Sequence, residues 1–254
     1  MTAEVLSILS VLAVSLVSLV GLVALSLSEV RLRKVASIFV SFAVGALLGD
    51  AFIHLIPETF SADASPLRGS LLILGGMLVF FAVEKLLRHR HGVLHQHHHL
   101  DHHVARPELA AINVFGDAIH NFIDGVLIGA SYLASPALGI STTAAVLLHE
   151  IPQEFGDFSI LIHSGLSVRK AILLNLASAS AAVLGAITAL LVGAFAGEAV
   201  VATLLPVTAG GFVYIAAADL IPELQEDRSL RALAAQMSLM SMGMGLMAVL
   251  AIVE

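Results

Sequence analysis

The sequence predicts an all-α integral membrane protein with eight transmembrane helices. Hydrophobic residues make up 58% of the 254 residues and charged residues only 12%, whereas soluble proteins have roughly 45 to 50% and about 25%. The apolar residues gather in eight runs, and about 20 apolar residues form a helix long enough to cross a bilayer. The basic residues concentrate in alternate connectors between these runs, which is typical of a multi-pass membrane protein.

Taken in chain order, the eight runs are separated by short connectors that carry polar residues or helix breakers. Ser135-Pro136 divides the fourth run from the fifth, and Ser167 divides the fifth from the sixth; Pro and Ser are typical of helix boundaries. Such short connectors predict a single transmembrane domain over residues 1–254. The expected spans are approximately residues 5–28, 35–57, 69–88, 107–133, 141–164, 169–194, 199–224 and 230–253.

The Lys and Arg residues test this topology independently. If eight helices alternate in direction, all of the 12 basic residues except Arg68 fall on one side of the membrane. The positive-inside rule makes that side cytoplasmic and so places both termini outside. The compact chain and short loops favour the plasma (inner) membrane of a bacterium, although a small eukaryotic organellar protein would share them.

A short internal echo predicts how the spans are grouped. The second span ends His54-Leu55-Ile56-Pro57-Glu58, and the seventh ends Asp219-Leu220-Ile221-Pro222-Glu223. In the topology above these ends face opposite sides, which fits an inverted repeat of helices 1–3 and 6–8 around a central pair, a 3+2+3 arrangement common in secondary transporters. A match of five residues also arises by chance.

Two segments place polar side chains inside the fourth and fifth spans. They read His120-Asn121-Phe122-Ile123-Asp124-Gly125 and His149-Glu150-Ile151-Pro152-Gln153-Glu154-Phe155-Gly156-Asp157. One charged residue at the centre of a membrane helix costs roughly 2.5 to 3.5 kcal/mol on insertion scales, so such groups usually mark an ion or substrate path. We therefore interpret these two segments as the functional centre.

The spacing of the polar residues predicts that those of each span share a face, because residues at i, i+1 and i+4 of a helix lie together. In the fourth span the polar face holds His120, Asn121 and Asp124, with Asp117 one turn earlier. In the fifth span the polar stripes hold His149, Gln153, Asp157, Glu150 and Glu154. Imidazole nitrogens with carboxylate and amide oxygens suit Zn(II), Fe(II) or Mn(II).

Helix breakers, small residues and single polar residues of the spans are interpreted as structural, because they bend helices, join them by hydrogen bonds or allow them to pack closely. Pro152 has no N–H, so it frees the carbonyl of Leu148 and is expected to bend its helix. Lone polar residues such as Asn175 and Ser178 are expected to make interhelical hydrogen bonds. Pairs of glycines four residues apart allow helices to approach closely; examples are Gly45 with Gly49 and Gly125 with Gly129.

Polar residues at the ends of the second and seventh spans have two interpretations. Asp50, His54, Asp219 and Glu223 lie near expected helix ends, where charged groups reach the interface at low cost. They belong either to the entrance or exit of an ion path or to ordinary solvated helix ends. Asp117 is a further candidate for the path.

A His-rich connector follows the third span, in residues 89–106. It is expected to be a cytoplasmic loop that binds transition metals, because neutral imidazoles at this density are metal ligands, although such tracts are poorly selective. A tolerated, solvated loop is the alternative. The histidines are His89, His91, His95, His97, His98, His99, His102 and His103.

Composition excludes several other classes of function. The formal charge of −7 provides no basic surface for nucleic acid, and the absence of Cys excludes thiolate ligands and disulfides. An intramembrane metal-dependent hydrolase of the zincin type needs two His one turn apart with a Glu base, but Gln153 replaces the second His. A metal sensor without flux is a further alternative, although the chain has no room for a soluble output domain.

The motifs together resemble the ZIP (Zrt/Irt-like) family of divalent metal transporters. The resemblance rests on HNFIDG, HEIPQEFGDF, GDAFIHLIPE and the His-rich tract, and it extends over essentially the whole chain. It implies uptake of zinc, or of iron, manganese or cadmium, toward the cytosol through a two-metal centre, with the metal as substrate and no cofactor or enzyme activity. Membrane lipid and a second copy of the chain in a homodimer are the other expected partners.

The same resemblance implies ligands by motif position. In the fourth span they are His120, Asn121 and Asp124, and in the fifth His149, Glu150 and Gln153, with Glu154 and Asp157 as the remaining acidic positions. Many relatives have HEIPHE where this chain has HEIPQE. An amide oxygen is a harder and weaker ligand than imidazole, so Gln153 is predicted to shift selectivity toward Fe(II) or Mn(II).

Overall fold

The structure is a computed structural model that describes residues 2–24, 29–62, 65–95, 107–196, 198–225 and 229–253. Every regular element within these ranges is a helix, which confirms the predicted all-α class for this part of the chain. Five helical stretches are long and apolar enough to cross a membrane: Ala3–Val20, Lys34–Ser61, Pro66–Val83, Val168–Phe195 and Leu230–Ile252. These stretches support the prediction of an integral membrane protein.

The described ranges contain eight helical stretches, and the first half of the chain supplies four of them. The first stretch contains α1 (Ala3–Leu16), η1 (Val17–Val20) and α2 (Gly21–Ala24). The second contains α3 (Glu29–Gly49), η2 (Asp50–Leu55) and α4 (Ile56–Ala62). The third and fourth are α5 (Pro66–His95) and α6 (Pro107–Ala134).

The second half supplies the other four stretches. The fifth is α7 (Pro136–His163), and the sixth contains α8 (Val168–Ala179) and α9 (Ala181–Ala196). The seventh contains α10 (Glu198–Tyr214), η3 (Ile215–Leu220) and α11 (Ile221–Leu224). The eighth is α12 (Leu230–Val253).

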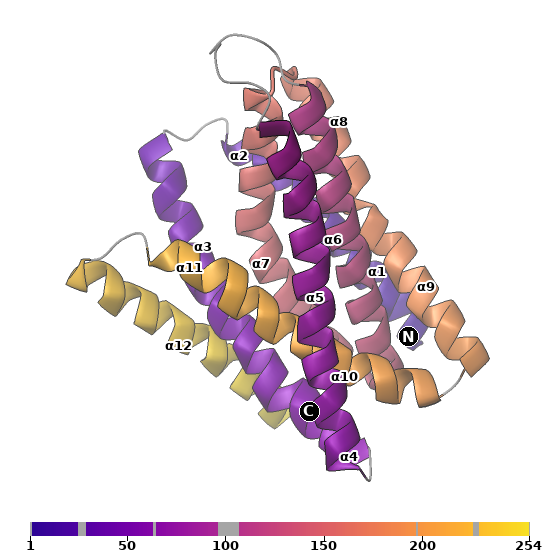
Figure 1. Cartoon of the computed structure of the whole chain (residues 1–254). Helices are drawn as coiled ribbons and strands as arrows, with labels where there is room; N and C mark the ends of the chain where they lie inside the picture. Colours follow the sequence, from indigo (N-terminus) through magenta and orange to yellow (C-terminus); the bar gives the residue numbers. More distant parts are fainter. Residues whose placement is uncertain are drawn as a thin grey trace.

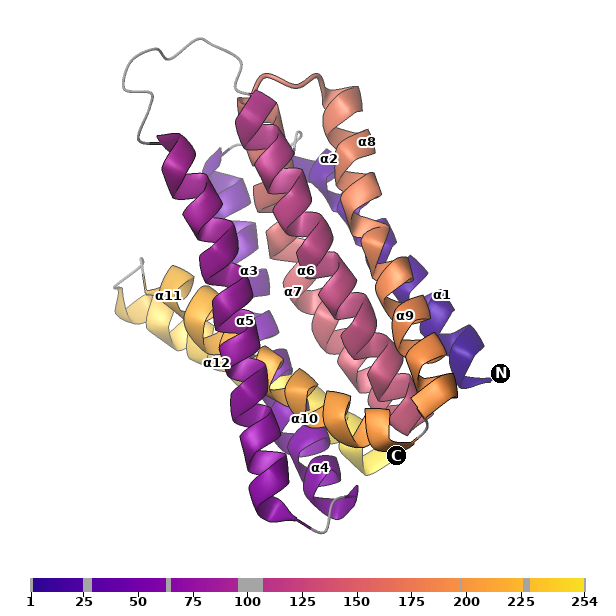
Figure 2. The same ribbon diagram turned by 45° about the vertical axis from the view of Figure 1, so that its right-hand side comes forward.

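Helices α6 and α7 carry the two polar segments that the sequence placed inside spans, and they lie in the middle of the molecule. Each has 28 residues, or about 42 Å at about 1.5 Å per residue, which exceeds the roughly 30 Å of a bilayer core. Figure 2 shows α6 and α7 between α5 on one side and α1, α8 and α9 on the other. Neighbouring helices therefore surround the polar residues of these two spans.

The helices pack in two groups that meet along α6 and α7. In one group α3 packs against α12 and α5 against α10, and in the other α6 packs against α7, α8 and α9, with α1 beside them. Contacts of α3 with α7 and of α10 with α6 join the groups. In Figure 1 the pair α11 and α12 is seen on the opposite side of the molecule from α8 and α9.

Close helix contacts at glycine confirm the prediction from the small-residue pairs. A Cβ atom on Gly45 would stand 2.0 Å from Met240 O, and one on Gly125 would stand 1.9 Å from Ala182 O. Both distances are far shorter than a van der Waals contact, so only glycine fits. These positions let α3 approach α12, and α6 approach α9, backbone to backbone.

Two π-helical turns interrupt otherwise α-helical stretches, and both adjoin the echoing sequence segments. Asp50–Leu55 forms the turn η2 and Ile215–Leu220 forms η3. An Ile-Pro-Glu sequence follows each turn directly. The helical backbone continues through Pro57 to Ala62, so the second stretch extends beyond the predicted end at residue 57.

The boundaries of α7 follow from local chemistry. The Ser135 hydroxyl accepts a hydrogen bond from Leu138 N at 3.1 Å and Pro136 occupies the first turn, an N-cap arrangement that stabilises a helix start. The helix then passes through Pro152 and ends at His163. Because α6 ends at Ala134, the two central helices are antiparallel neighbours joined by Ser135.

Candidate metal centre

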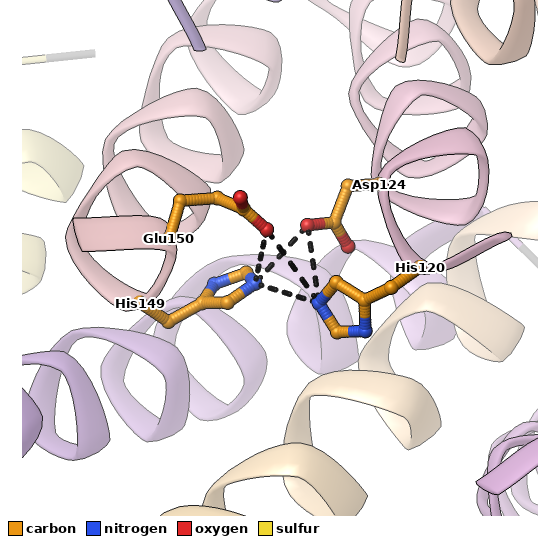
Figure 3. A group of neighbouring side chains, drawn as sticks. All are labelled: His120, Asp124, His149 and Glu150. Atoms are coloured by element: carbon orange, nitrogen blue, oxygen red, sulfur yellow. Dashed lines mark hydrogen bonds and ion pairs between the residues drawn. The ribbon is translucent and has the colours of Figure 1, made fainter. Parts of the chain in front are cut away.

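Four metal-ligating side chains from α6 and α7 converge at the centre of the molecule. His120 and Asp124 come from α6, one turn apart, and His149 and Glu150 are consecutive residues of α7. One ligand atom from each residue lies within 4.8 Å of the other three. Figure 3 shows the four side chains pointing toward one another from the two helices.

The distances between the ligand atoms match the edges of a small coordination polyhedron. His149 Nε2 lies 3.1 Å from Asp124 Oδ2 and 3.7 Å from Glu150 Oε1. His120 Nε2 lies 3.6 Å from each of the same two oxygens and 3.4 Å from His149 Nε2. Ligands placed about 2.1 Å from a tetrahedral zinc ion are about 3.4 Å apart. The four atoms thus surround a space of the size that Zn²⁺ requires.

Burial differs among the four residues of the cluster. The side chains of Asp124, His149 and Glu150 are at most 1% exposed, whereas that of His120 is 22% exposed. A buried carboxylate pair without a cation is unfavourable in a low-dielectric interior. The arrangement therefore favours a divalent cation, with His120 as the most exposed of the four residues.

Neighbouring groups fix the orientation of His149. Its Nδ1 lies 3.2 Å from the carbonyl oxygen of Ala145, and because a carbonyl only accepts, Nδ1 is the donor. Nε2 is then left with its lone pair toward the cluster, as in many metal-binding histidines. The Phe212 ring of α10 packs edge-on at 6.5 Å between ring centroids and closes one side of the cluster with apolar surface.

Asn121 and Asp117 form a polar layer next to the cluster. Asn121 is fully buried, and its Nδ2 donates to Asp117 Oδ1 at 2.8 Å. The other oxygen of Asp117 accepts from Ser178 Oγ of α8 at 2.5 Å. Asn121 Oδ1 has no hydrogen-bond partner, so the predicted ligand oxygen is not used within the protein.

The remaining predicted positions of α7 lie farther along the same helix. Gln153 is half-buried, one turn beyond His149, and Asp157 is half-buried one turn farther. Glu154 is 1% exposed and accepts a hydrogen bond from Asn175 Nδ2 of α8. These three residues are not among the four whose ligand atoms meet.

Asp50 and His54 form a separate buried pair in the π-helical turn η2. Their Oδ1 and Nδ1 atoms are 3.1 Å apart, and Asp50 Oδ2 accepts from Thr142 Oγ1 of α7 at 3.1 Å. Asp50 is 0% and His54 5% exposed. The sequence placed them near a solvated helix end, but the helix continues past them and neighbouring helices enclose them.

Some candidate positions lie where the side chains are not described. Asp219 is part of η3 and Glu223 of α11, but their side chains are outside the described set. The backbone of α5 is helical through His95, which includes His89 and His91 in a helix. The other histidines of the tract lie outside the described residues: His97, His98, His99, His102 and His103.

The sequence did not single out Thr142, Asn175 and Ser178 as part of the polar centre. Each makes a hydrogen bond to a buried carboxylate, at Asp50, Glu154 and Asp117 respectively. The spacing of Asn175 and Ser178 indicates that they share one face of α8, but it does not indicate which groups that face contacts. Their partners, however, lie 21 and 61 residues away in the chain.

Comparison with known proteins gives consistent matches over most of the chain. The family described as "ZIP Zinc transporter" matches residues 1–109 and 89–251. A protein of Caenorhabditis briggsae named zinc transporter zipt-7.1 is 32% identical, over 85% of this chain and 71% of its own length. Mouse zinc transporter ZIP4 is 33% identical over 76% of this chain and 39% of its own length.

A further relative, zinc transporter zipt-7.2 of Caenorhabditis elegans, is 35% identical over 85% of this chain. The chain spans 58% of that protein and 39% of mouse ZIP4. The matched parts therefore represent a portion of some relatives and most of others.

Proposed function

Because this chain belongs to the ZIP zinc transporter family, we propose that it carries Zn²⁺ or a similar divalent transition metal ion across the membrane toward the cytosol. The observation that carries the proposal is the cluster of His120, Asp124, His149 and Glu150, whose ligand atoms lie within 4.8 Å of one another. Two imidazoles and two carboxylates prefer Zn²⁺ and its transition-metal neighbours to Mg²⁺ or Ca²⁺.

Transport through this cluster uses exchange of ligands, with no covalent chemistry. A hydrated ion reaches His120, which is the accessible ligand, and exchanges its water for the other three ligands. Release then requires a change in the packing of α6 and α7 against their neighbours. Zn²⁺ is the first expected substrate, with Fe²⁺, Mn²⁺ and Cd²⁺ as further substrates, and no cofactor takes part.

We place a second metal ion beside the first, as part of the same proposal. Its ligands are Asn121, Glu150 and Gln153, with Glu154 and Asp157 as acidic neighbours. The oxygen atoms Asn121 Oδ1 and Glu150 Oε1 are buried and have no hydrogen-bond partner, which supports a role as ligands. Glu150 would bridge the two ions.

An inverted 3+2+3 repeat accounts for several paired features of the fold. A Cβ on Gly45 would stand 2.0 Å from Met240 O of α12, and one on Gly210 would stand 2.0 Å from Ile73 O of α5. Gly45 and Gly210 precede the two echoing segments by the same number of residues. The π-helical turns η2 and η3 are likewise equivalent under this repeat, which supports it beyond the five-residue match.

The direction of transport, toward the cytosol, is what the family resemblance implies. The distribution of basic residues predicts a cytoplasmic His-rich segment and outward termini, and the compact chain with short loops favours a bacterial plasma membrane. We propose that the segment buffers or regulates the arriving metal. Enzyme activity is not part of the proposal, because four protein ligands complete a tetrahedron, whereas a catalytic zinc keeps one position for water.

Uptake by purified protein in liposomes tests this function. Zinc, iron, manganese and cadmium entering the lumen are measured together with internal pH, for the native chain and for Asp124→Ala. Saturable uptake that is lost in the variant is the expected result. A Ser180→Ala variant is the control, because this exposed hydroxyl only bonds to its own helix, at Ala177 O. Metal binding without uptake, or normal uptake by Asp124→Ala at equal reconstitution, would refute the proposed path.

A further inference from the structure

Two uncharged side chains of helix α8, Asn175 and Ser178, donate hydrogen bonds to buried carboxylates of the central helices. Ser178 Oγ lies 2.5 Å from Asp117 Oδ2 of α6, and Asn175 Nδ2 donates to Glu154 Oε2 of α7. Both α8 residues are at most 2% exposed. Since residues three apart share a face, both hydrogen bonds come from one face of α8.

Both carboxylates lie on the same side of the four-residue cluster. Asp117 is one turn before His120 on α6, and Glu154 is one turn after Glu150 on α7. Because α6 and α7 are antiparallel, both positions are displaced toward the end of the bundle where α6 begins and α7 ends. Helix α8 begins just after α7, at Val168, so its first turns run along that end (Figure 2).

The donors are uncharged, and this matters for a cation path. Asp117 and Asp157 lie close enough to Glu154 for their charges to interact with it, so the layer holds three carboxyl groups close together. Amide and hydroxyl donors fix the direction of a carboxylate without cancelling its charge, whereas a Lys or Arg in their place would neutralise it. The protein thus supplies no cation of its own to these carboxylates, and a mobile cation can balance their ionised form.

Unused oxygen atoms remain in the same layer. Glu154 Oε1, Asn175 Oδ1 and Asn121 Oδ1 are buried and have no hydrogen-bond partner. Both amides use their nitrogen as donor, to Glu154 and to Asp117 respectively, so their oxygens are left as acceptors. Unsatisfied buried acceptors are rare in native proteins and call for water, a proton or a cation.

We propose that Asn175 and Ser178 of α8 are positioning residues of the metal path. They hold the carboxylates of Glu154 and Asp117 in place, so that these oxygens form a binding site for a partly hydrated divalent cation beside the histidine cluster. They act through the two carboxylates. This inference rests on the proposed function and adds a third helix to the two that carry the family's motifs.

Substitution of Ser178 tests the inference with two readouts. Ser178→Ala removes the donor to Asp117, and Ser178→Thr keeps a hydroxyl at the same place. In liposomes the maximal rate of zinc uptake is expected to fall about 10-fold in Ser178→Ala, the scale found for groups that orient metal ligands, and to recover in Ser178→Thr. Equilibrium titration of the purified protein with Co²⁺ is expected to stay within about twofold of native, since the four cluster residues are intact.

A matched control removes a bond of similar kind that touches no carboxylate. Ser15 Oγ of α1 donates to Ala179 O of α8 at 2.8 Å, so Ser15→Ala loosens the same helix without affecting the layer, and near-native uptake is expected. Equal losses of uptake in Ser15→Ala and Ser178→Ala, or normal uptake in Ser178→Ala, would overturn the inference.

The asparagine provides an independent second variant. Asn175→Asp keeps the size of the side chain but turns the donor toward Glu154 into an acceptor, so it is expected to lower the uptake rate at unchanged Co²⁺ affinity. A native rate in this variant contradicts the role of Asn175. If Asp124→Ala abolishes uptake while the α8 variants transport normally, only this inference fails; if the native chain takes up no metal, the proposed function fails and the inference with it.

Discussion

At the scale of single residues, the two histidines of the cluster differ in how firmly they are held. His149 is buried and bonded through Nδ1 to Ala145 O at 3.2 Å, whereas the side chain of His120 is 22% exposed. The sequence predicted which residue types meet, because the i, i+4 spacing of His120 and Asp124 is local. It did not predict the α8 and Thr142 contacts, since these depend on which helices become neighbours.

Gln153 is the residue at which selectivity is expected to differ from relatives with a second His. Gln153→His replaces an amide oxygen with an imidazole nitrogen, which prefers Zn²⁺ more strongly. Competition uptake with zinc, iron and manganese is expected to shift toward zinc in this variant. An unchanged ranking of the metals would remove the basis for assigning selectivity to position 153.

Thr142 is expected to contribute to stability through Asp50. Thr142→Val keeps the shape but leaves Asp50 Oδ2, which is buried, without the donor at 3.1 Å. Loss of a partner for a buried polar group costs about 1 to 3 kcal/mol. Thermal unfolding in detergent should therefore show a lower midpoint for Thr142→Val than for Thr142→Ser, which keeps the hydroxyl. Equal midpoints would show that this bond is dispensable.

At the scale of elements, breakers predicted where the connectors lie, but the bounds of the spans differ from the prediction by a few residues. Ser135-Pro136 was expected to divide the fourth span from the fifth, which was predicted to begin near residue 141, and the structure begins α7 at Pro136 with a side-chain cap. Pro57 was expected to end the second span, but the helix continues to Ala62. Pro57 follows the π-helical turn η2, where the hydrogen-bond register of the backbone changes, and the sequence pattern does not reveal such a turn.

Two adjacent glycines of α5 separate the effect of helix propensity from that of helix packing. A Cβ on Gly76 would stand 2.4 Å from Val207 O of α10, whereas one on Gly75 meets nothing within 4 Å. Gly76→Ala is expected to force α5 and α10 apart and lower the unfolding midpoint in detergent. Gly75→Ala should keep or raise it, since Ala favours a helix by about 1 kcal/mol over Gly. The reverse order would contradict the packing of α5 on α10.

At the scale of the whole molecule, the membrane class and the family were predicted from composition and motifs, and both are confirmed. The topology was predicted from the number of apolar runs, because each run has at least the roughly 20 residues that a bilayer core requires. The orientation of the chain is predicted only from the alternation of basic residues. Within the described ranges, only five helical stretches are apolar enough to be recognised as spans on their own. The central pair needs its neighbours to cover its polar face.

Orientation is accessible to direct labelling because the chain contains no Cys. Single cysteines at Ser65 and Ser167, which are both exposed, report on connectors that the basic residues assign to opposite sides. An impermeant maleimide added to intact cells is expected to label Ser65→Cys, and to label Ser167→Cys only after permeabilisation. The opposite pattern would contradict the predicted orientation, with both termini outside.

The composition of the cluster has an electrical consequence. Asp124 and Glu150 contribute two negative charges, the two neutral imidazoles contribute none, and one divalent ion adds two positive charges. The cluster loaded with one ion is then electroneutral, whereas an empty cluster with both carboxylates ionised would carry a double negative charge, which is costly in a medium of low dielectric constant. Under the proposed function, such a site would move its ion through the membrane interior with little dependence on the membrane voltage. The return of the empty site would then be the step that a voltage or a compensating proton governs.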